Sequence, residues 1–393
     1  MDHKPSLKPS NSFIGGLIYD LVFYIIVISL GIVAISTLCF YSLSFRLQGI
    51  LYMPTTFKTL LQPSPSPSPS PSSSYHVLSS NSASSSKNSN FTSIALKESL
   101  MHNMTDQELF VKASMVRGNQ DNKTTPKVAF MFLAQGALPL APLWEKFFKG
   151  HKGFYNIYLH QHPSFNETLP QDSVFYGRKI PSQPVYWGTS SMIDAERRLL
   201  GNALMDSSNQ YFVLLSESCI PLFGFKTIYD YLINSTLSFL SSYDDKRKAG
   251  RGRYNSTMSP TINITNWRKG SQWFELHRDL AMQIVSDTKY YNIFQQHCHQ
   301  PCYPDEHYIP TFVHMMYPEL NSNRSLTYVD WSRGGPHPRK FGLHDITNQF
   351  LNQTRYGSRC SYNGKITNIC YLFARKFDPS TLQPLLQVSS WHE

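Results

Sequence analysis

The chain has 393 residues, a formal net charge of +10 and 41% hydrophobic residues. This length leaves room for one large domain with a substantial core, next to shorter segments of other kinds. The positive charge alone would suit a nucleic-acid-binding protein. The amino-terminal segments described next instead predict a compartment without nucleic acid.

Residues 21–43 form an apolar run of 23 residues without a charge, long enough to cross a bilayer as a helix. The run lacks the short apolar core and small-residue cleavage pattern of a removable signal peptide. We therefore expect a transmembrane signal anchor, with a cytoplasmic tail at 1–20 and the lipid bilayer as a partner through one helix.

Nine Asn-x-Ser/Thr sequons follow the anchor, so we expect the carboxy-terminal side to be lumenal and the protein to be type II. A basic lumenal domain meets nucleotide phosphates, acidic glycans or the membrane surface rather than nucleic acid. The sequons, as N-glycosylation candidates, are at Asn90, Asn103, Asn122, Asn166, Asn234, Asn255, Asn263, Asn323 and Asn352.

Residues 44–126 are predicted to be a lumenal stem. Within it, residues 63–74 read PSPSPSPSPSSS, which favours an extended backbone and offers no apolar surface to bury. Ser/Asn-rich sequence continues to Thr92, and we expect this stretch to stay disordered. Aromatic and aliphatic residues become dense at 127–393, which predicts one large folded domain with its own core.

The first half of this domain alternates strands and helices. Continuous apolar runs of strand length begin at Val128, Phe154 and Tyr211. Ser191, with Asp194 three residues later, predicts a capping box at the start of a helix. Buried strands separated by helices predict an α/β fold with a central, mostly parallel sheet.

Ligands of such sheets bind outside the carboxyl ends of the strands. Gln135, His160 and Glu217 lie at or just after the carboxyl ends of the three predicted strands, so we expect them near one cleft. Glu217 is a candidate carboxylate for the chemistry, although a carboxylate at a strand end can also simply accept backbone hydrogen bonds.

Familiar phosphate and metal motifs are absent from the sequence. Asp244 and Asp245 are adjacent rather than an Asp-x-Asp pair, and on a strand they would point to opposite faces. Residues 296–307 mix Cys298 and Cys302 with histidines, but the C-x3-C spacing has no second pair and the lumen oxidises thiols. We expect no metal.

The cysteines of the domain allow two short-range disulfides. Cys298 and Cys302 could pair across a tight loop, and Cys360 and Cys370 could close a hairpin. This pairing would leave Cys219 as a buried free thiol. Sequence alone does not give the connectivity, so other pairings stay open.

The longest motifs lie in the second half of the domain. In order and spacing they resemble the plant branch of the core-2/I-branching β-1,6-N-acetylglucosaminyltransferase family, over nearly all of residues 127–379. The motifs are LLSESCIPL at 214–222, WRKGSQWFEL at 267–276, PDEHY at 304–308, YVDWSRGGPHP at 328–338 and CYLFARKF at 370–377.

The resemblance implies a GT-A-like nucleotide-sugar fold, a Golgi membrane address and metal-independent inverting transfer from a UDP-sugar to a glycan or glycoprotein acceptor. The UDP-sugar is then a co-substrate, and no cofactor is implied. Residues 241–253 share little with the animal enzymes, so the resemblance leaves the donor sugar and the acceptor open.

The resemblance also assigns roles to residues. Glu306, in the PDE segment, is the general base, a role that a carboxylate can fill. Lys376 binds the donor diphosphate, and the second donor cation is Arg355, with Arg359 and Lys365 as rivals.

The remaining site predictions concern the two sides of the cleft. Neighbours on an extended segment point to opposite faces, so we expect only one of Arg375 and Lys376 to enter the cleft. The resemblance selects Lys376 and leaves Arg375 as a surface or structural partner, or a lesser donor-site cation. Gln135 and His160 are predicted on the donor side. Trp331 and Glu217 are predicted on the acceptor side.

Two other functions remain compatible with the sequence. A non-catalytic lumenal lectin or scaffold would keep the fold and need no base. A glycosidase would need two carboxylates about 5 to 10 Å apart, roles for which Glu217 and Glu306 are available.

Overall fold

The computed structural model describes residues 28–29, 100–118, 124–167 and 169–388. The chain divides into two compact units, Met1–Ser82 and Ala83–Glu393, and the fold below belongs to the second. The predicted tail, nearly all of the predicted anchor and the Pro/Ser repeat lie outside the described residues. Within the described ranges, no helix is long and apolar enough to cross a membrane.

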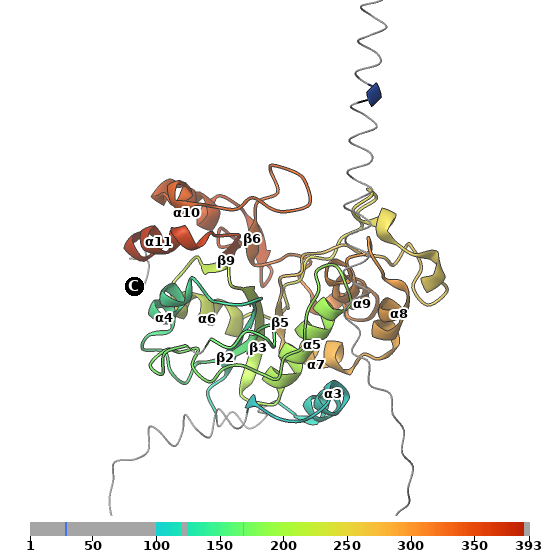
Figure 1. Ribbon diagram of the computed structural model, residues 1–393, viewed down its shortest axis with the longest axis horizontal. Coiled ribbons are helices and arrows are strands. Elements are labelled where there is room, and N and C mark those ends of the chain that lie inside the picture. Colours follow the sequence, from blue (N-terminus) through green and yellow to red (C-terminus); the bar gives the residue numbers. More distant parts are fainter. Residues whose placement is uncertain (1–27, 30–99, 119–123, 168, 389–393) are drawn as a thin grey trace, which may run out of the picture. The chain divides into compact units, whose positions relative to one another are not determined.

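A four-stranded sheet in the order β2-β1-β3-β5 forms the centre of the unit (Figure 1). Strand β1 (Lys127–Leu133) pairs in parallel with β2 (Tyr155–His160) and with β3 (Asn209–Ser216). Strand β5 (Glu275–His277) is antiparallel to β3. The three predicted strands are confirmed, and the fold is mixed α/β with a parallel-rich sheet.

The parallel strands end level with one another. Leu133 is in register with His160 on one side and with Ser216 on the other, so their carboxyl ends form one edge. A second sheet has the strand order β4-β9-β6, and its first strand, β4, follows β3 in the sequence. Its strands, and those of a separate hairpin, are β4 (Ile220–Pro221), β6 (Thr327–Val329), β9 (Phe373–Arg375), β7 (Cys360–Tyr362) and β8 (Lys365–Thr367).

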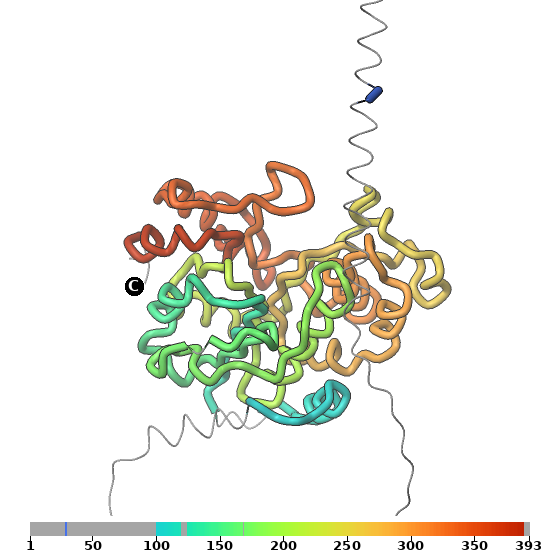
Figure 2. Tube along the Cα trace, in the orientation of Figure 1, coloured from blue at the N-terminus to red at the C-terminus, as the bar shows by residue number. Residues whose placement is uncertain are grey.

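Helices cover both faces of the central sheet. They are α3 (Asp106–Met115), α4 (Ala141–Phe148), α5 (Ser191–Leu204), α6 (Phe225–Ile233), α7 (Arg278–Ser286), α8 (Lys289–His297), α9 (Tyr308–Met316), α10 (Asn348–Tyr356) and α11 (Leu382–Val388). Figure 2 shows the carboxy-terminal segment, in red, beside the green α4 region, and α11 contacts α4.

Alternate residues of β1 enter two separate cores. Val128, Phe130 and Phe132 pack in one core with residues of α4, α6 and β9. Ala129 and Met131 pack in the other with residues of α5, α7, α8 and α9. This period of two follows from the strand pleat, and burial on both faces explains the continuous apolar run in the sequence.

The capping box predicted at Ser191 is wrong. Ser191 is the first residue of α5, and the N-cap position is Ser190, which makes no side-chain capping bond. The Ser191 hydroxyl instead accepts a hydrogen bond from the backbone N–H of Tyr186 at 2.8 Å. The Ser191 hydroxyl therefore bonds to the loop before α5 and does not cap the amino-terminal end of the helix.

Helix α3 lies inside the range 44–126 that was predicted as stem, beyond the Ser/Asn-rich stretch that ends at Thr92. The helix begins with a true capping box between Thr105 and Glu108, and Leu109 is buried. Asp106 forms an ion pair with Arg198 of α5 at 2.5 Å. These contacts attach α3 to α5 of the folded unit.

Candidate active site

A cavity of about 1370 Å³ opens at the carboxyl edge of the central sheet. Gln135, His160 and Glu217 all line it, as their positions after the strands led us to expect. His160 is 1% exposed, and its Nε2 accepts a hydrogen bond from Arg198 at 3.2 Å. Burial, followed by the charge of Arg198, lowers the pKa of His160 to about 3, so this imidazole is neutral.

Glu306 also lines the cavity, at the end of the 3₁₀ turn Pro304–Glu306 that precedes α9. Its carboxylate forms ion pairs with Lys269 and Arg253. Burial raises the pKa of Glu306, but the two cations outweigh burial and leave the pKa below its ordinary value. The carboxylate is therefore ionised and lies in a cavity that a substrate can enter.

The backbone around Lys269 holds this cation beside Glu306. Lys269 exchanges backbone hydrogen bonds of 2.9 Å with Tyr243, and the N–H of Gly270 donates to the Glu306 carbonyl at 2.8 Å. A Cβ at Gly270 would lie 2.0 Å from the Ser241 carbonyl oxygen, so only glycine fits here. The close approach of the two segments depends on that glycine.

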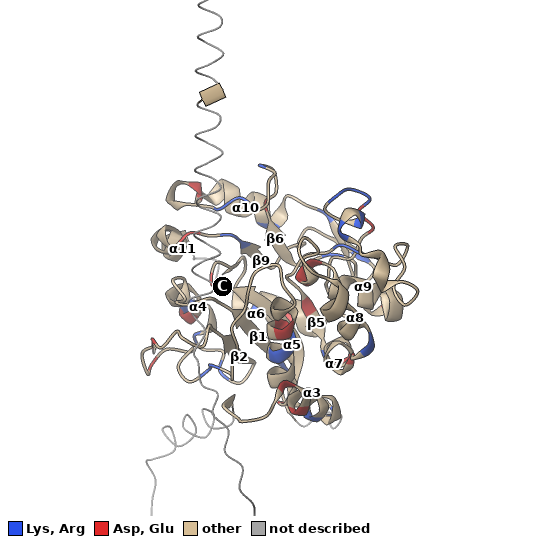
Figure 3. Cartoon of the chain, turned by 45° about the vertical axis from the view of Figure 1, so that its right-hand side comes forward, with Lys and Arg blue, Asp and Glu red and all other residues tan. Residues whose placement is uncertain are grey.

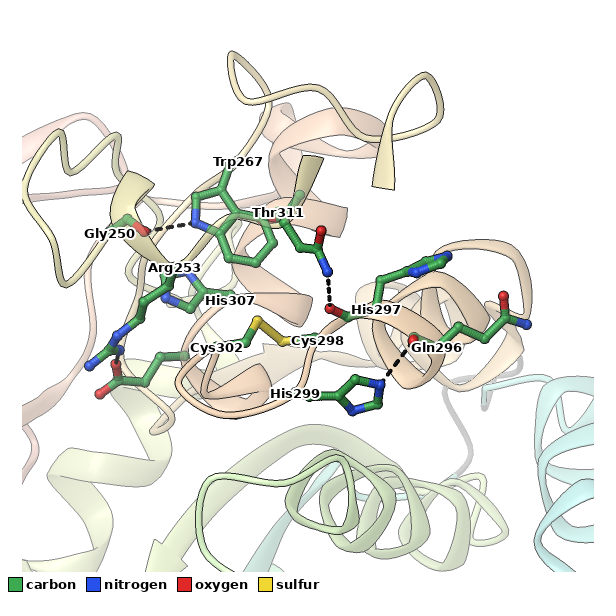
Figure 4. The surroundings of a disulfide bond; sticks show 12 residues. Gly250, Arg253, Trp267, Gln296, His297, Cys298, His299, Cys302, His307 and Thr311 are labelled. Carbon is green, nitrogen blue, oxygen red and sulfur yellow. Dashed lines mark hydrogen bonds and ion pairs between the residues drawn. A yellow bond between two sulfur atoms is a disulfide. The ribbon is translucent and has the colours of Figure 1, made fainter. Parts of the chain in front are cut away.

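Arg253 contacts the same carboxylate oxygen of Glu306 as Lys269, Oε2. Its guanidinium carbon lies 4.2 Å from the ring centroid of Tyr303, which directly precedes the Pro304–Glu306 turn. Figure 4 shows the Arg253 side chain extended to a carboxylate, below the loop that carries Gly250. The cation–π contact restricts the guanidinium while its N–H groups remain on the carboxylate.

Cations gather at another part of the same cavity. Arg375, Lys376 and Arg359 line it, and Figure 3 shows lysine and arginine segments in blue beside β9. Arg375, expected as a surface or structural partner or a lesser donor-site cation, thus lines the same cavity as Lys376. The Arg375 guanidinium stacks on Trp273 at the cavity wall, which keeps a second positive charge there.

Arg355 is not among the cavity-lining residues. It lies in the last turn of α10, and its Nε donates to the Leu222 carbonyl at 2.5 Å. Its guanidinium carbon lies 5.9 Å from the ring centroid of Phe223. Lys365 is exposed on β8 and does not line the cavity either, so of the three predicted rivals the structure brings only Arg359 to it.

The family model of the core-2/I-branching enzymes matches residues 128–355. The chain belongs to this family. A relative from rice, Oryza sativa subsp. japonica, named Glycosyltransferase BC10, is 36% identical over 310 residues, which cover 67% of this chain and 76% of the relative. The protein is thus a glycosyltransferase, and the glycosidase and non-catalytic alternatives are set aside.

Exposed aromatic residues form part of the glycosyltransferase cavity wall. Trp331 is 49% exposed and Trp187 is 53% exposed, and both line the cavity. The Trp187 ring lies 5.0 Å from Tyr303 and 5.5 Å from His337, measured between centroids. Such surfaces are suited to the apolar faces of sugar rings because they bury area without demanding hydrogen bonds.

The cysteine pairs of the glycosyltransferase lie at disulfide distance in the predicted combination. Cys298 is bonded to Cys302, with 5.2 Å between their Cα atoms, and Cys360 is bonded to Cys370, with 5.7 Å. Cys219 is the buried free thiol of the described residues, and its Sγ accepts from the Ser216 N–H at 3.3 Å.

Histidines near the first disulfide point in different directions (Figure 4). His297 Nδ1 contacts the Thr257 hydroxyl at 3.1 Å, while His307 Nδ1 donates to the Arg268 carbonyl at 2.8 Å. Across the part of the chain that the structure describes, no group of three or more His, Cys, Asp or Glu residues could hold a metal ion.

Sequence reasoning did not identify the two cations that contact Glu306. Lys269 lies within the WRKGSQWFEL motif, which marked the family without assigning it a role. Arg253 ends a basic cluster, KRKAGRGR, in the stretch that shares little with the animal enzymes. Both meet Glu306 only through tertiary folding, from 37 and 53 residues away in the sequence.

Proposed function

We propose that this glycosyltransferase transfers a sugar from a UDP-sugar to a glycan or glycoprotein acceptor, with inversion and without a metal. The observation that carries the proposal is the ionised Glu306 carboxylate in a cavity that also contains Arg375 and Lys376. Such a transfer needs a base to take the acceptor proton and cations to stabilise the leaving group, and both kinds of group are present in this cavity.

Glu306 acts as the general base in this mechanism. The acceptor hydroxyl oxygen attacks the anomeric carbon, the bond from that carbon to UDP breaks, and the electron pair leaves with UDP. The hydroxyl proton passes to Glu306. Lys269 and Arg253 keep Glu306 ionised beforehand and orient it.

Lys376, Arg375 and Arg359 stabilise the leaving group. UDP gains negative charge as the glycosidic bond breaks, so fixed cations lower the energy of the transition state more than that of the bound donor. Gln135 and neutral His160, at the strand ends, supply hydrogen bonds to the uncharged parts of the donor.

The acceptor binds on the aromatic side of the cavity. Trp331 and Trp187 offer ring faces on which a sugar stacks, and Glu217 accepts hydrogen bonds from sugar hydroxyls. The mixed α/β, parallel-rich sheet fits a GT-A-like arrangement, in which the donor lies at the carboxyl ends of the strands.

The proposal includes a type II topology in the Golgi membrane. It is supported by the uncharged run at 21–43 and by nine sequons on its carboxy-terminal side. The Golgi address itself comes from the family resemblance.

The test is to incubate the folded unit with a panel of UDP-sugars, with and without glycan acceptors, and to measure UDP release. We expect acceptor-stimulated UDP release with one donor, unchanged by excess chelator. UDP release that stops on chelation and returns with Mn²⁺ would refute the metal-free mechanism. Absence of release with every UDP-sugar would refute the donor class.

A further inference from the structure

Two buried rings close to Glu306 have no role in the mechanism proposed above. His307 directly follows Glu306 in the sequence, and Trp267 lies two residues before Lys269. His307 is 0% exposed, Trp267 is 1% exposed, and neither lines the cavity. The two rings stack on each other, with 4.5 Å between their centroids and 20° between their planes (Figure 4). They therefore act on the site, if at all, through the residues that they hold.

The Trp267 ring fixes the loop that carries Arg253. Its Nε1–H donates to the Gly250 carbonyl at 3.1 Å in a buried hydrogen bond, drawn as a dashed line in Figure 4. The backbone N–H of Arg253 donates to the same carbonyl at 3.0 Å. The Gly250 carbonyl thus joins the indole ring to the residue whose guanidinium contacts Glu306.

The His307 ring fixes the segment that carries Lys269. Its Nδ1–H donates to the Arg268 carbonyl at 2.8 Å. The hydroxyl of Thr311, on α9, accepts from the Arg268 N–H at 3.0 Å. Both backbone groups of Arg268 are therefore bound to side chains of one short segment, and the next residue, Lys269, extends its ammonium group to Glu306.

His307 is not itself a base in this site. Burial lowers the pKa of His307 to about 3, against the smaller opposing effect of its bond to the Arg268 carbonyl. The ring is neutral and its proton is on Nδ1, because a carbonyl oxygen only accepts. Its buried Nε2 has no partner among the described residues. A ring outside the cavity cannot take a proton from an acceptor, so its role is to hold the Arg268 carbonyl.

We propose that Trp267 and His307 are positioning residues for the base, which together hold Arg253 and Lys269 on the Glu306 carboxylate. The stacked pair links the two segments that supply the cations. The attraction between a cation and a carboxylate falls with distance, so loss of either backbone anchor weakens the stabilisation of ionised Glu306. This inference rests on the proposed role of Glu306, so it needs one measurement that requires no substrate.

The other titratable groups that face Glu306 do not obscure such a measurement. Burial, then the charge of Glu306, raises the pKa of Asp305 to about 6, so Asp305 is mostly neutral at more acidic pH. Burial and nearby carboxylates raise the pKa of Tyr243, which is neutral there as well. In the acid range, the ionisation of Glu306 is therefore set by burial, by Lys269 and by Arg253.

The measurement is a titration of Glu306 by NMR. Protein labelled with ¹³C at the glutamate side-chain carboxyls gives a Glu306 signal, identified by its absence from Glu306→Gln. In folded wild type we expect this signal to titrate below pH 4.5, because the pKa is lowered from that value. In Trp267→Phe, which keeps a stacking ring but loses the Nε1–H donor, it should titrate about 0.5 pH unit or more higher.

A pair of His307 variants tests the second anchor. His307→Leu keeps a buried side chain without a donor, so it should raise the titration of Glu306 by a similar amount. His307→Asn should shift it less, because the asparagine amide N–H takes the place of the Nδ1–H donor. Equal shifts in the two variants would mean that the bond to the Arg268 carbonyl does not position Lys269.

Trp144→Phe is the matched control. Trp144, on α4, is buried in the other core, and its Nε1–H donates to the Cys219 carbonyl at 3.2 Å. The same indole bond is lost there, so we expect Glu306 to titrate within about 0.2 pH unit of the wild type. A Trp267→Phe titration no higher than that of the wild type, or matched by Trp144→Phe, would overturn the positioning role.

Turnover separates this inference from the proposed function. In an assay of UDP release, the acid limb of the pH–rate profile should move in Trp267→Phe by the same amount as the Glu306 signal. An acid limb that stays in place while the signal moves would refute Glu306 as the base, although the signal would still support the positioning role. An unshifted signal would overturn the positioning role whatever the turnover.

Discussion

The guanidinium carbon of Arg375 lies 4.1 Å from the ring centroid of Trp273 at the wall of the cavity. The ring restricts a cation that would otherwise sample many rotamers, so its charge is already in place when an anion arrives. Burial lowers the pKa of Arg375, yet a guanidinium remains charged in any protein. The neighbouring Lys376 contributes a second, more flexible charge.

The donor-site cations should differ in their effect on UDP binding. We expect Lys376→Ala and Arg375→Ala each to weaken UDP affinity about tenfold or more, because each removes a charge-assisted contact with the diphosphate. Arg359→Ala should weaken it to a smaller extent, since Arg359 is exposed. Arg355→Ala is the control, expected to leave affinity within about twofold. Calorimetric titration of UDP measures these affinities. A larger loss of UDP affinity in Arg355→Ala than in Arg359→Ala would contradict the placement of Arg359, rather than Arg355, at the cavity.

Glu306→Gln should lower turnover by about 10² or more, because the amide keeps the shape of the side chain but cannot take the acceptor proton. UDP affinity should remain close to that of the wild type. The measurement pairs steady-state UDP release with UDP calorimetry on the same sample. Turnover that is unaffected by the substitution would remove Glu306 from the role of base.

Lys269→Met should shift the acid limb of the pH–rate profile to higher pH. The wild-type limb should lie below pH 4.5, because the pKa of Glu306 is lowered from that value. Without Lys269, the effect of burial is opposed only by Arg253, so the pKa of Glu306 rises and protonation removes the base at a higher pH. Lys226→Met, at an exposed ion pair on α6, serves as the control. An acid limb that stays in place would show that Lys269 does not set the ionisation of Glu306.

Helix α3 should stabilise the folded unit. Asp106→Ala leaves the Arg198 side chain, which is 4% exposed, without its carboxylate, and we expect a loss of about 1 to 3 kcal/mol of unfolding free energy. Lys112→Ala, on the exposed face of the same helix, should change it by less than about 0.5 kcal/mol. Urea unfolding of the two variants provides the comparison, and equal stabilities would mean that α3 is only loosely attached.

Glycan occupancy should differ between sequons in a secretory host. Asn166 and Asn352 are exposed, whereas the amide nitrogen of Asn255 donates to the His297 carbonyl at 3.0 Å and its oxygen accepts from Thr257. A glycan on that nitrogen would break the contact. We expect glycopeptide mass spectrometry to find Asn166 and Asn352 occupied and Asn255 free, and high occupancy at Asn255 would contradict the folded contact.

Local patterns predicted the elements that depend on local physics. The apolar runs at Val128, Phe154 and Tyr211 identified the parallel strands, and the positions after them identified three residues that line the cavity. The Ser191 hydroxyl was misassigned because a loop residue outside the motif competes for it. Helix α3 was missed because its few buried residues follow a long polar segment.

Contacts between distant segments could not be predicted in the same way. Nothing in the sequence near Glu306 specifies Lys269 or Arg253, since the turn, the glycine at 270 and the basic loop meet only in the folded unit. Strand alternation predicts opposite faces for Arg375, the last residue of β9, and its neighbour Lys376, so it could not show that both residues line the cavity.

The alternation of β1 has an evolutionary consequence. Phe130 and Phe132 support the layer that includes Phe373 and Phe377, next to the donor cations, while Met131 supports the layer that includes the aromatic residues around the base. A change in side-chain size on one face of this strand is absorbed largely by one layer. On the function proposed above, substitutions on the β1 face that packs with Phe373 and Phe377 would act on the nucleotide side of the cavity more than on the side of the base, so the two sides could diverge separately in evolution.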